Sequence, residues 1–280
     1  GKFMFKIVSK SSLAVNEFDL WIEAPRIART VKAGQFCVLR VHEKGERLPL
    51  TVADTKPEEG LIRMIFQTVG KSTTQLGTLE VGDCIYDILG PLGRPSEVGK
   101  IGTVMMVGGG VGIAALFPIV KALKEQGNKV ITILGGRTKD LVIMKEECAR
   151  YSDELIVTTD DGSEGIKGVV TTAMQMVADR GEKVASCWAI GPSIMMKFAS
   201  IKAKELNIPC WVSLNPVMID GTGMCGCCRV TVGEDTKFAC VDGPEFDGWK
   251  VNWNEFMNRL RAYKEEENIS LEKYKMEVGE

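Results

Sequence analysis

The pattern of apolar residues changes near residue 100, and this change limits the possible folds more than any other feature of the sequence. From Gly102 to Leu214, short apolar runs of strand length alternate with longer segments whose apolar residues recur at helical spacing. Such alternation predicts a parallel sheet with helices on both faces, because parallel neighbours need a long crossover between them. Strands are expected at residues 103–107, 129–134, 154–158, 186–190 and 208–214, and helices at residues 113–126, 141–150, 169–179 and 193–206.

The first part of the chain has strand-like runs only, separated by turns rich in glycine, proline and charge. Several short runs at this spacing predict a small antiparallel β-barrel. These strands are expected at residues 3–8, 18–23, 35–41, 50–53, 61–68 and 84–89. The predicted fold class is therefore β plus α/β, with a barrel over residues 1–98 and a doubly wound parallel-sheet domain over residues 99–214.

Two shorter segments follow the predicted sheet domain. Residues 215–248 are rich in glycine and cysteine, and as loops they are too short to form a core unless a cofactor supplies one. Residues 249–280 predict a helical extension with one apolar face. We expect this face to pack on the same chain, with a partner subunit as the alternative; it consists of Trp253, Phe256, Met257, Leu260 and Tyr263.

Charge and hydropathy exclude several classes of function. The net charge of -2 gives no electrostatic footprint of a nucleic-acid partner. No run reaches the roughly 18 apolar residues of a membrane span, and the N-terminal residues lack the apolar core of a signal peptide. We therefore expect a cytoplasmic protein without membrane contact. His42 is the single histidine, so neither His-based zinc catalysis nor a Ser-His-Asp triad is expected.

The stretch from Val104 to Ala115 has the pattern of a strand, a glycine turn and the start of a helix. Glycines let the backbone approach a pyrophosphate, and the helix N-terminus offers unpaired N–H groups. A turn of this kind can also serve only to join a strand tightly to a helix, and its spacing departs from Gly-x-Gly-x-x-Gly. Further glycine and polar residues follow the later strands, where open α/β sheets bind ligands. The candidate dinucleotide-binding residues are Gly109, Gly110, Val111, Gly112, Gly136, Arg137, Asp160, Asp161, Gly191 and Pro192.

Asp160 and Asp161 follow the third predicted strand, where the adenosine ribose is expected. A carboxylate there accepts hydrogen bonds from ribose hydroxyls and repels a 2′-phosphate. The sequence therefore favours NAD(H) over NADP(H).

Four of the nine cysteines lie close together in the segment from Cys225 to Cys240. Without a signal peptide, such crowding points to a metal centre and not to disulfides. The spacing Cys225-x2-Cys228 with a distant Cys240 matches the plant-type [2Fe–2S] pattern except at its first position, where Asp220 stands. We therefore expect a [2Fe–2S] cluster held by Asp220, Cys225, Cys228 and Cys240. Two alternatives stay open, namely Cys227 in place of Asp220 and a structural zinc site.

The remaining cysteines are scattered through apolar stretches. We expect them to behave as small buried hydrophobic residues. They are Cys37, Cys84, Cys148, Cys187 and Cys210.

The glycine loop, the strand ends and the Asp220-x4-Cys225-x2-Cys228 segment together resemble the ferredoxin–NADP+ reductase superfamily, over nearly the whole chain. More narrowly, they resemble the branch with a C-terminal [2Fe–2S] module, to which the electron-transfer subunit of dihydroorotate dehydrogenase belongs. Asp220 and the continuation over residues 241–248 are most similar to the small subunits of NADH-dependent reduced ferredoxin:NADP+ oxidoreductases.

The resemblance implies FAD in the barrel, held by two motifs. The first, of the type Arg-x-aromatic-Ser/Thr, is matched by residues 47–51, with the arginine one residue early and a leucine in place of the aromatic ring. The second, of the type Gly-x-x-Ser/Thr, is matched by residues 70–73, which fail the P-loop pattern because position 65 is Ile65. The FAD-binding residues implied are Arg47, Pro49, Leu50, Thr51, Gln67, Gly70, Ser72 and Thr73.

The resemblance also implies the activity. A hydride passes between NAD(H) and FAD, and single electrons pass through the [2Fe–2S] cluster to a larger flavoprotein or iron–sulfur partner subunit, in electron bifurcation among NADH, ferredoxin and NADP. No catalytic acid or base is implied, because the cofactors carry the reactivity. With other partners, the same design serves dihydroorotate dehydrogenase, sulfide dehydrogenase or hydrogenase complexes. A non-catalytic zinc-binding module on a reductase fold is the alternative from another class.

Overall fold

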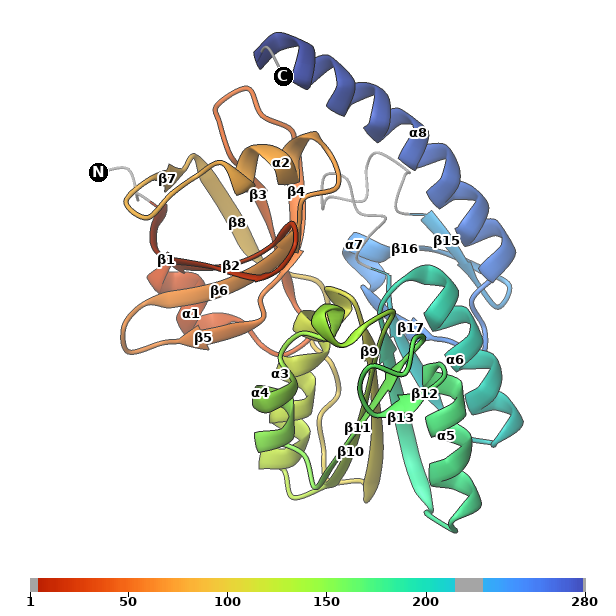
Figure 1. The fold of residues 1–280 in the computed structure, drawn as a ribbon. Helices are drawn as coiled ribbons and strands as arrows, with labels where there is room; N and C mark the ends of the chain where they lie inside the picture. The colour runs from red at the N-terminus through yellow and green to blue at the C-terminus, as the bar shows by residue number, and fades with distance from the viewer. Residues whose placement is uncertain (1–4, 215–228, 279–280) are drawn as a thin grey trace.

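The computed structural model describes residues 5–214 and 229–278. Its N-terminal part is an antiparallel barrel made of two sheets, with the strand orders β5-β6-β2-β1-β7 and β4-β3-β8 (Figure 1). The strands are β1 (Phe5–Ala14), β2 (Glu17–Glu23), β3 (Phe36–Arg40), β4 (Arg47–Thr51), β5 (Asp54–Lys56), β6 (Leu61–Gln67), β7 (Cys84–Ile85) and β8 (Asp87–Leu92). Two short helices, α1 (Pro25–Thr30) and α2 (Lys71–Gly77), complete the barrel.

Alternation along β2 and β6 divides their side chains between the inside and the outside of the barrel. Leu20 and Met64 point inward, where they are fully buried in the barrel core. Asp19, Arg63 and Ile65 point outward, toward the second domain.

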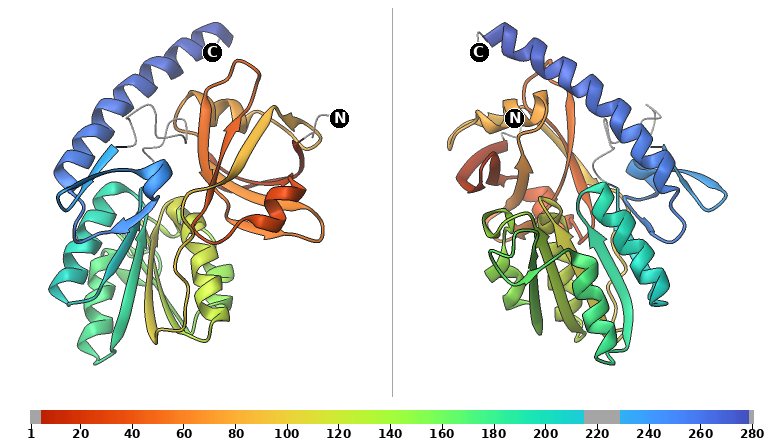
Figure 2. Two further views of the ribbon diagram at one scale, coloured as in Figure 1. Left: turned by 180° about the vertical axis from the view of Figure 1, so that it is seen from behind. Right: turned by 45° about the vertical axis from the view of Figure 1, so that its right-hand side comes forward.

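The second domain is a seven-stranded sheet with the order β12-β11-β10-β9-β13-β14-β17, parallel except for β17. Its strands are β9 (Thr103–Gly109), β10 (Lys129–Gly136), β11 (Glu154–Thr159), β12 (Ile166–Lys167), β13 (Val184–Ile190), β14 (Cys210–Ser213) and β17 (Glu245–Asp247). Helices α3 (Gly112–Glu125) and α4 (Lys145–Arg150) cover one face, and α5 (Val170–Asp179) and α6 (Ser193–Glu205) cover the other. Seen from behind, the linker from the barrel runs along the sheet domain to the start of β9 (Figure 2, left).

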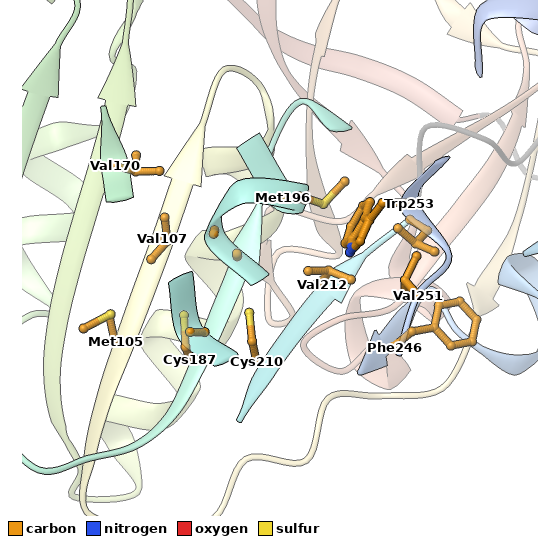
Figure 3. Packing of buried hydrophobic residues seen from close by; sticks show 14 of the residues in the cluster. Met105, Val107, Val170, Cys187, Met196, Cys210, Val212, Phe246, Val251 and Trp253 are labelled. Carbon is orange, nitrogen blue, oxygen red and sulfur yellow. The ribbon is translucent and has the colours of Figure 1, made fainter. Parts of the chain in front are cut away.

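The C-terminal part contributes β15 (Arg229–Val232), β16 (Asp235–Phe238), α7 (Ala239–Asp242) and α8 (Trp253–Val278) in addition to β17. Helix α8 packs against β15 and α6, and then continues past the end of the sheet to α2 of the barrel (Figure 1). One buried cluster joins the sheet to this C-terminal part: Met105, Val107 and Val212 of the sheet continue into Phe246 and Trp253 (Figure 3). No described helix is both long enough and apolar enough to cross a membrane.

The predicted fold class is confirmed, and each predicted strand and helix of the sheet domain has a counterpart. The helix predicted over residues 141–150 is wrong in extent, because the left-handed backbone of Met144 (φ 59°) delays its start until Lys145. Residues 215–248 were expected to be loops, which is wrong for their described part: β15, β16, α7 and β17 lie there. Helices α1 and α2 were not predicted.

The apolar face predicted after residue 249 packs on the same chain, as expected, through Trp253, Phe256 and Leu260. Met257 is half-buried, and the side chain of Tyr263 lies outside the described part. Cys84 is exposed, which contradicts the expectation of burial; Cys37, Cys148, Cys187 and Cys210 are buried.

Candidate functional site

The strand order places a topological switch point beside β9. From β9 the chain proceeds to β10 and β11 on one side, and then returns to place β13 and β14 on the other side. Open α/β sheets bind ligands at such a point, outside the carboxyl ends of the strands. The loop after β9, with Gly109–Gly112, and the loop after β13, with Gly191 and Pro192, meet there, so six of the predicted residues come together.

Two glycines give the loop after β9 its shape. A Cβ atom on Gly112 would lie 2.5 Å from the carbonyl oxygen of Ile190, so only glycine lets this loop lie against β13. Gly110 has a φ of +54°, and the atom nearest to its absent Cβ is Cδ of Pro192 at 4.0 Å. Among the described residues, no side chain caps the start of α3 and no acidic residue lies in its first turn. A close-packed loop that is open at its tip and precedes a helix N-terminus fits a pyrophosphate.

The loops after β10 and β11 lie side by side at the same edge of the sheet. The amide of Asp160 donates to the carbonyl of Gly136 (3.1 Å), and the amide of Asp161 donates to the carbonyl of Arg137 (3.2 Å). Hydrogen bonds from the hydroxyl and amide of Ser163 hold the pKa of Asp161 below its usual value. Both aspartates are exposed. A negative charge therefore stands beside the glycine-containing end of β10, as the ribose hypothesis requires.

The residues implied for flavin binding come from β4, the end of β6 and α2, which pack beside one another. Leu50 packs on the barrel core, so by strand alternation Pro49 and Thr51 point to the opposite face of β4. Gln67 is exposed at the end of β6. Leu50 is therefore unsuited to the ring-stacking position of the motif, and Pro49 and Thr51 are placed better to face a flavin.

Thr73 shapes the second flavin motif. Its buried hydroxyl accepts hydrogen bonds from the amides of Val69 and Gly70, both 3.0 Å long, and donates to the carbonyl of Gly70. The hydroxyl is thus used inside the protein, which leaves the backbone amide of Thr73 as the group suited to a phosphate. The Ser72 hydroxyl donates to the carboxylate of Glu46 (3.3 Å), which precedes Arg47. These contacts bring the two motifs to one place on the barrel.

Only one of the four predicted cluster ligands, Cys240, lies in the described part of the chain. Asp220, Cys225 and Cys228 lie outside the described residues, and Cys227 does too. The backbone of Cys240 lies in α7, between β16 and β17. Within residues 5–214 and 229–278, the described side chains include no group of three or more histidine, cysteine, aspartate or glutamate residues placed to hold a metal ion.

Arg63 joins the barrel to the sheet domain, although its side chain is only 7% exposed. Its guanidinium donates two hydrogen bonds to Asp19 of β2 (2.9 and 2.7 Å) and two to Glu147 of α4 (2.6 and 3.0 Å). Burial alone would lower the pKa of Arg63, but the two carboxylates outweigh burial and raise it. Lys121 of α3 and Asp54 of β5 form a second ion pair across the same boundary (3.2 Å). The barrel is thereby fixed to the helix that follows the glycine loop.

Two residues that join parts of the chain were not predicted from the sequence: Arg63, and Glu245, whose carboxylate accepts hydrogen bonds from Ser96 and Trp188. The available signal for Arg63 was a lone charge inside the apolar run of residues 61–66. Glu245 gave no comparable signal, because its neighbours in sequence read as a polar turn.

Comparison with known proteins agrees with this geometry. Residues 106–200 match the oxidoreductase NAD-binding domain, and residues 215–252 match the iron–sulfur cluster binding domain of dihydroorotate dehydrogenase B. The second match favours iron over the zinc alternative. Together with the structural relatives, these matches confirm the predicted cofactor set of FAD, a [2Fe–2S] cluster and NAD(H).

Similar proteins extend over the full chain. A Thermotoga maritima protein named as a homologue of the dihydroorotate dehydrogenase B (NAD(+)) electron transfer subunit is 56% identical, covering 100% of this chain and 99% of its own. The subunit of that name from Desulforamulus reducens is 33% identical over 90% of this chain and 98% of its own. A solved structure, reported for flavin-based electron bifurcation by the NADH-dependent reduced ferredoxin-NADP oxidoreductase, has a TM-score of 0.91 and 56% identity, covering 98% and 99% of the two chains.

These matches confirm the expected resemblance and an oxidoreductase that transfers electrons. The chain belongs to the family of dihydroorotate dehydrogenase B electron-transfer subunits and their homologues.

Proposed function

We propose that this chain exchanges a hydride between NAD(H) and FAD and passes single electrons through a [2Fe–2S] cluster to a larger flavoprotein partner. The proposed setting is flavin-based electron bifurcation among NADH, ferredoxin and NADP. The similarity of 56% identity over nearly the full length of the bifurcating oxidoreductase chain supports this setting. The relatives that are named as subunits of dihydroorotate dehydrogenase itself are less similar, at 31–34% identity.

One observation carries the proposal: the loops after β9 and β13 meet at the switch point, with the approach of Gly112 to Ile190 made possible by a missing side chain. Gly109, Gly110, Val111 and Gly112 would hold the pyrophosphate of NAD(H) at this point. Gly191 and Pro192 would border the nicotinamide half. The residues proposed for the adenosine half are Gly136, Arg137, Asp160 and Asp161.

For FAD, the geometry supports Thr51 and Gln67 toward the ring and Gly70, Ser72 and the Thr73 amide toward the phosphates. Arg47 is exposed at the start of β4, and its guanidinium would suit a phosphate group of FAD. For the cluster, the donor set Asp220, Cys225, Cys228 and Cys240 has the chemistry of an iron–sulfur site. When bound, these cofactors supply two-electron exchange with nicotinamide and one-electron transfer.

The residues of the chain then act by positioning, because hydride transfer between cofactors depends on their relative placement. Arg63, Asp19 and Glu147 hold the barrel against α4, and Lys121 with Asp54 holds it against α3. The glycine loop precedes α3 directly. These ion pairs therefore connect β2, β5 and β6 of the barrel to α3 and α4, the helices nearest the glycine loop in the chain.

The test is anaerobic purification of the full chain, followed by an absorption spectrum and analysis of flavin, iron and zinc. We expect flavin bands together with broad iron–sulfur absorbance, and iron without zinc. Colourless protein, or protein with zinc and no FAD, would contradict the proposal.

A second candidate is the electron-transfer role in a dihydroorotate dehydrogenase, which the named relatives support at lower identity. The protein that co-purifies from the native host decides between them. A larger subunit that oxidises dihydroorotate supports the second candidate, and one that reduces NADP with ferredoxin supports the first.

A further inference from the structure

Glu245 lies where three parts of the chain meet. It begins β17, which pairs with β14 at the edge of the sheet and follows the segment with the predicted cluster ligands. The linker between the barrel and the sheet domain, residues 93–98, passes beside it. Trp188 of β13 reaches it across the neighbouring strand β14.

The Glu245 carboxylate connects these parts with both of its oxygens. The Ser96 hydroxyl of the linker donates to Oε2 (2.5 Å), and Nε1 of Trp188 donates to Oε1 (3.0 Å). Ser96 is 8% exposed and Trp188 is 2% exposed. The Trp188 indole is a donor only, so away from water it requires an acceptor. One carboxylate therefore satisfies a buried donor of the sheet domain and a buried hydroxyl of the linker at once.

The backbone around Glu245 is tied to the same parts. The amide of Arg94 in the linker donates to the carbonyl of Gly243 (2.8 Å), and the amide of Leu214 after β14 donates to the carbonyl of Pro244 (2.8 Å). On its other side the linker is tied to the barrel, since the amide of Ser96 donates to the carbonyl of Ala33 (2.9 Å). Hydrogen bonds therefore join the barrel to the linker and the linker to the segment that contains β17.

Gly93 shows how closely barrel and cluster segment approach at this point. A Cβ atom on Gly93 would lie 2.9 Å from Cε1 of Phe36 in the barrel and 2.9 Å from Cδ of Pro244. Any side chain at position 93 would push the two apart. Direct packing at Gly93 therefore sets the distance between the barrel and the segment that precedes β17. The hydrogen bonds of Glu245 hold the same segment in place.

From this geometry we propose that Glu245 is a positioning residue. It fixes residues 243–247, which follow the predicted cluster ligand Cys240, against the barrel–sheet linker and so sets the rate of electron transfer between flavin and cluster. The inference rests on the proposed function. Within the described part of the chain, Glu245 acts through its hydrogen bonds to Ser96 and Trp188 and through the backbone of residues 243–247.

The first test uses the full chain and needs no turnover. Hydrogen–deuterium exchange is measured for β14, β17 and residues 93–98 in Glu245→Leu and Glu245→Gln. Leucine accepts no hydrogen bond, so we expect exchange in these segments to rise about tenfold or more. Glutamine offers its oxygen to Trp188 and its amide to Ser96, so exchange should stay at the wild-type rate. Equal exchange in all three proteins would overturn the proposal.

The second test separates the two transfer steps in protein reconstituted with FAD and cluster. Anaerobic stopped-flow mixing with NADH follows flavin bleaching, and rapid-freeze EPR follows the reduced cluster. For Glu245→Leu we expect flavin bleaching within about twofold of wild type and cluster reduction at least about tenfold slower, because small misplacements cost this much or more. Glu245→Gln should restore cluster reduction. Glu182→Leu, which removes an ion-pair carboxylate next to Lys129 at the opposite end of the strands, is the matched control.

The outcomes are distinguishable from failure of the proposed function. If NADH fails to bleach the flavin of the wild-type protein, the proposed function is wrong. If wild type and Glu245→Leu reduce the cluster at the same rate, only the role of Glu245 is wrong. If both steps fall equally in Glu245→Leu, the residue serves general stability and the positioning role is rejected.

Discussion

Two junctions hold this chain together, and they are built from different chemistry. The barrel meets the sheet domain through ion pairs, with Arg63 between Asp19 and Glu147. The cluster segment meets the sheet through one continuous apolar cluster, with Glu245 bonded to uncharged donors at its margin. A buried ion pair leaves an uncompensated charge when one member is removed, whereas a lost carboxylate at the second junction leaves only neutral donors unpaired. The first junction should therefore be more sensitive to the loss of one charged side chain than the second.

The largest effect is expected for Arg63→Met, which leaves Asp19 and Glu147 facing each other without a cation. Breaking a buried pair from one side costs about 3–5 kcal/mol of unfolding free energy. Urea denaturation measures this value. Arg180→Met is the control, because Arg180 pairs with Glu154 on the surface and should cost less than about 1 kcal/mol. Equal losses of unfolding free energy in the two variants would show that the buried ion pairs of Arg63 stabilise the protein no more than a surface ion pair does.

An effect of about 2–5 kcal/mol, at most equal to that of Arg63→Met, is expected for Gly93→Ala, which lies between the barrel and the segment before β17. Its φ of +82° costs an alanine about 1–2 kcal/mol, and the contacts of the new methyl with Phe36 and Pro244 add about 1–3 kcal/mol by overpacking. Gly82→Ala separates the two terms, because Gly82 has a φ of +96° with no atom within 4 Å of its absent Cβ. The difference in unfolding free energy between the variants measures the packing. A difference of zero would contradict close packing at Gly93.

The two junctions should also differ in their response to pH. Burial raises the pKa of Glu245, and the charge of Glu97 adds to this, while the hydrogen bonds from Ser96 and Trp188 oppose it. A raised pKa in the folded state means that stability is full below the unfolded pKa of about 4.3 and is lost as the pH rises through the folded value. Arg63 keeps its charge throughout this range, so its own titration contributes no such change.

The matching measurement is the urea midpoint at pH 5.5 and pH 7.5. We expect wild type to be more stable at pH 5.5, and this difference to shrink in Glu245→Gln, which has no proton to lose. Burial also raises the pKa of Glu17, which therefore changes the stability with pH in the same direction. Glu17 is present in both proteins, so its contribution cancels in the comparison. If the difference between the urea midpoints at the two pH values is the same in Glu245→Gln as in wild type, titration of Glu245 does not cause the pH dependence.

The smallest effect on stability is expected outside both junctions. Asp160 is exposed in the loop after β11, so Asp160→Ser should change the unfolding free energy by less than about 0.5 kcal/mol. Loss of its negative charge should still raise kcat/KM for NADPH by about tenfold relative to NADH, since repulsion of the 2′-phosphate falls. Steady-state kinetics with both coenzymes measures the ratio. An unchanged ratio would remove Asp160 from the ribose site.

The sequence predicted those parts of the fold in which apolar residues recur with a clear strand or helix period. The apolar runs of β9, β10 and β13 are buried on both faces and stand out, and so does the helical spacing of α3. Short elements were missed for a physical reason: α2 has only seven residues and follows a glycine N-cap, and β17 has three residues whose strand pairing depends on β14.

The candidate site shows the same division. Glycines and aspartates at strand ends were predicted, because the sheet pattern alone places those ends at one edge. The joining residues Glu245 and Arg63 were not predicted, because their partners are far away in sequence. Glu245 bonds to Ser96 and Trp188, which are 149 and 57 residues away. Arg63 and Glu147 are separated by 84 residues, and only the packing of two domains brings them together.

An anaerobic titration of the full chain with NADH tests the central claim most directly. A chain that holds FAD and a [2Fe–2S] cluster takes up three electrons, so about one and a half equivalents of NADH should bleach the flavin and produce the EPR signal of the reduced cluster. Bleaching that ends after about one equivalent, with no cluster signal, or the absence of any bleaching, would contradict the account.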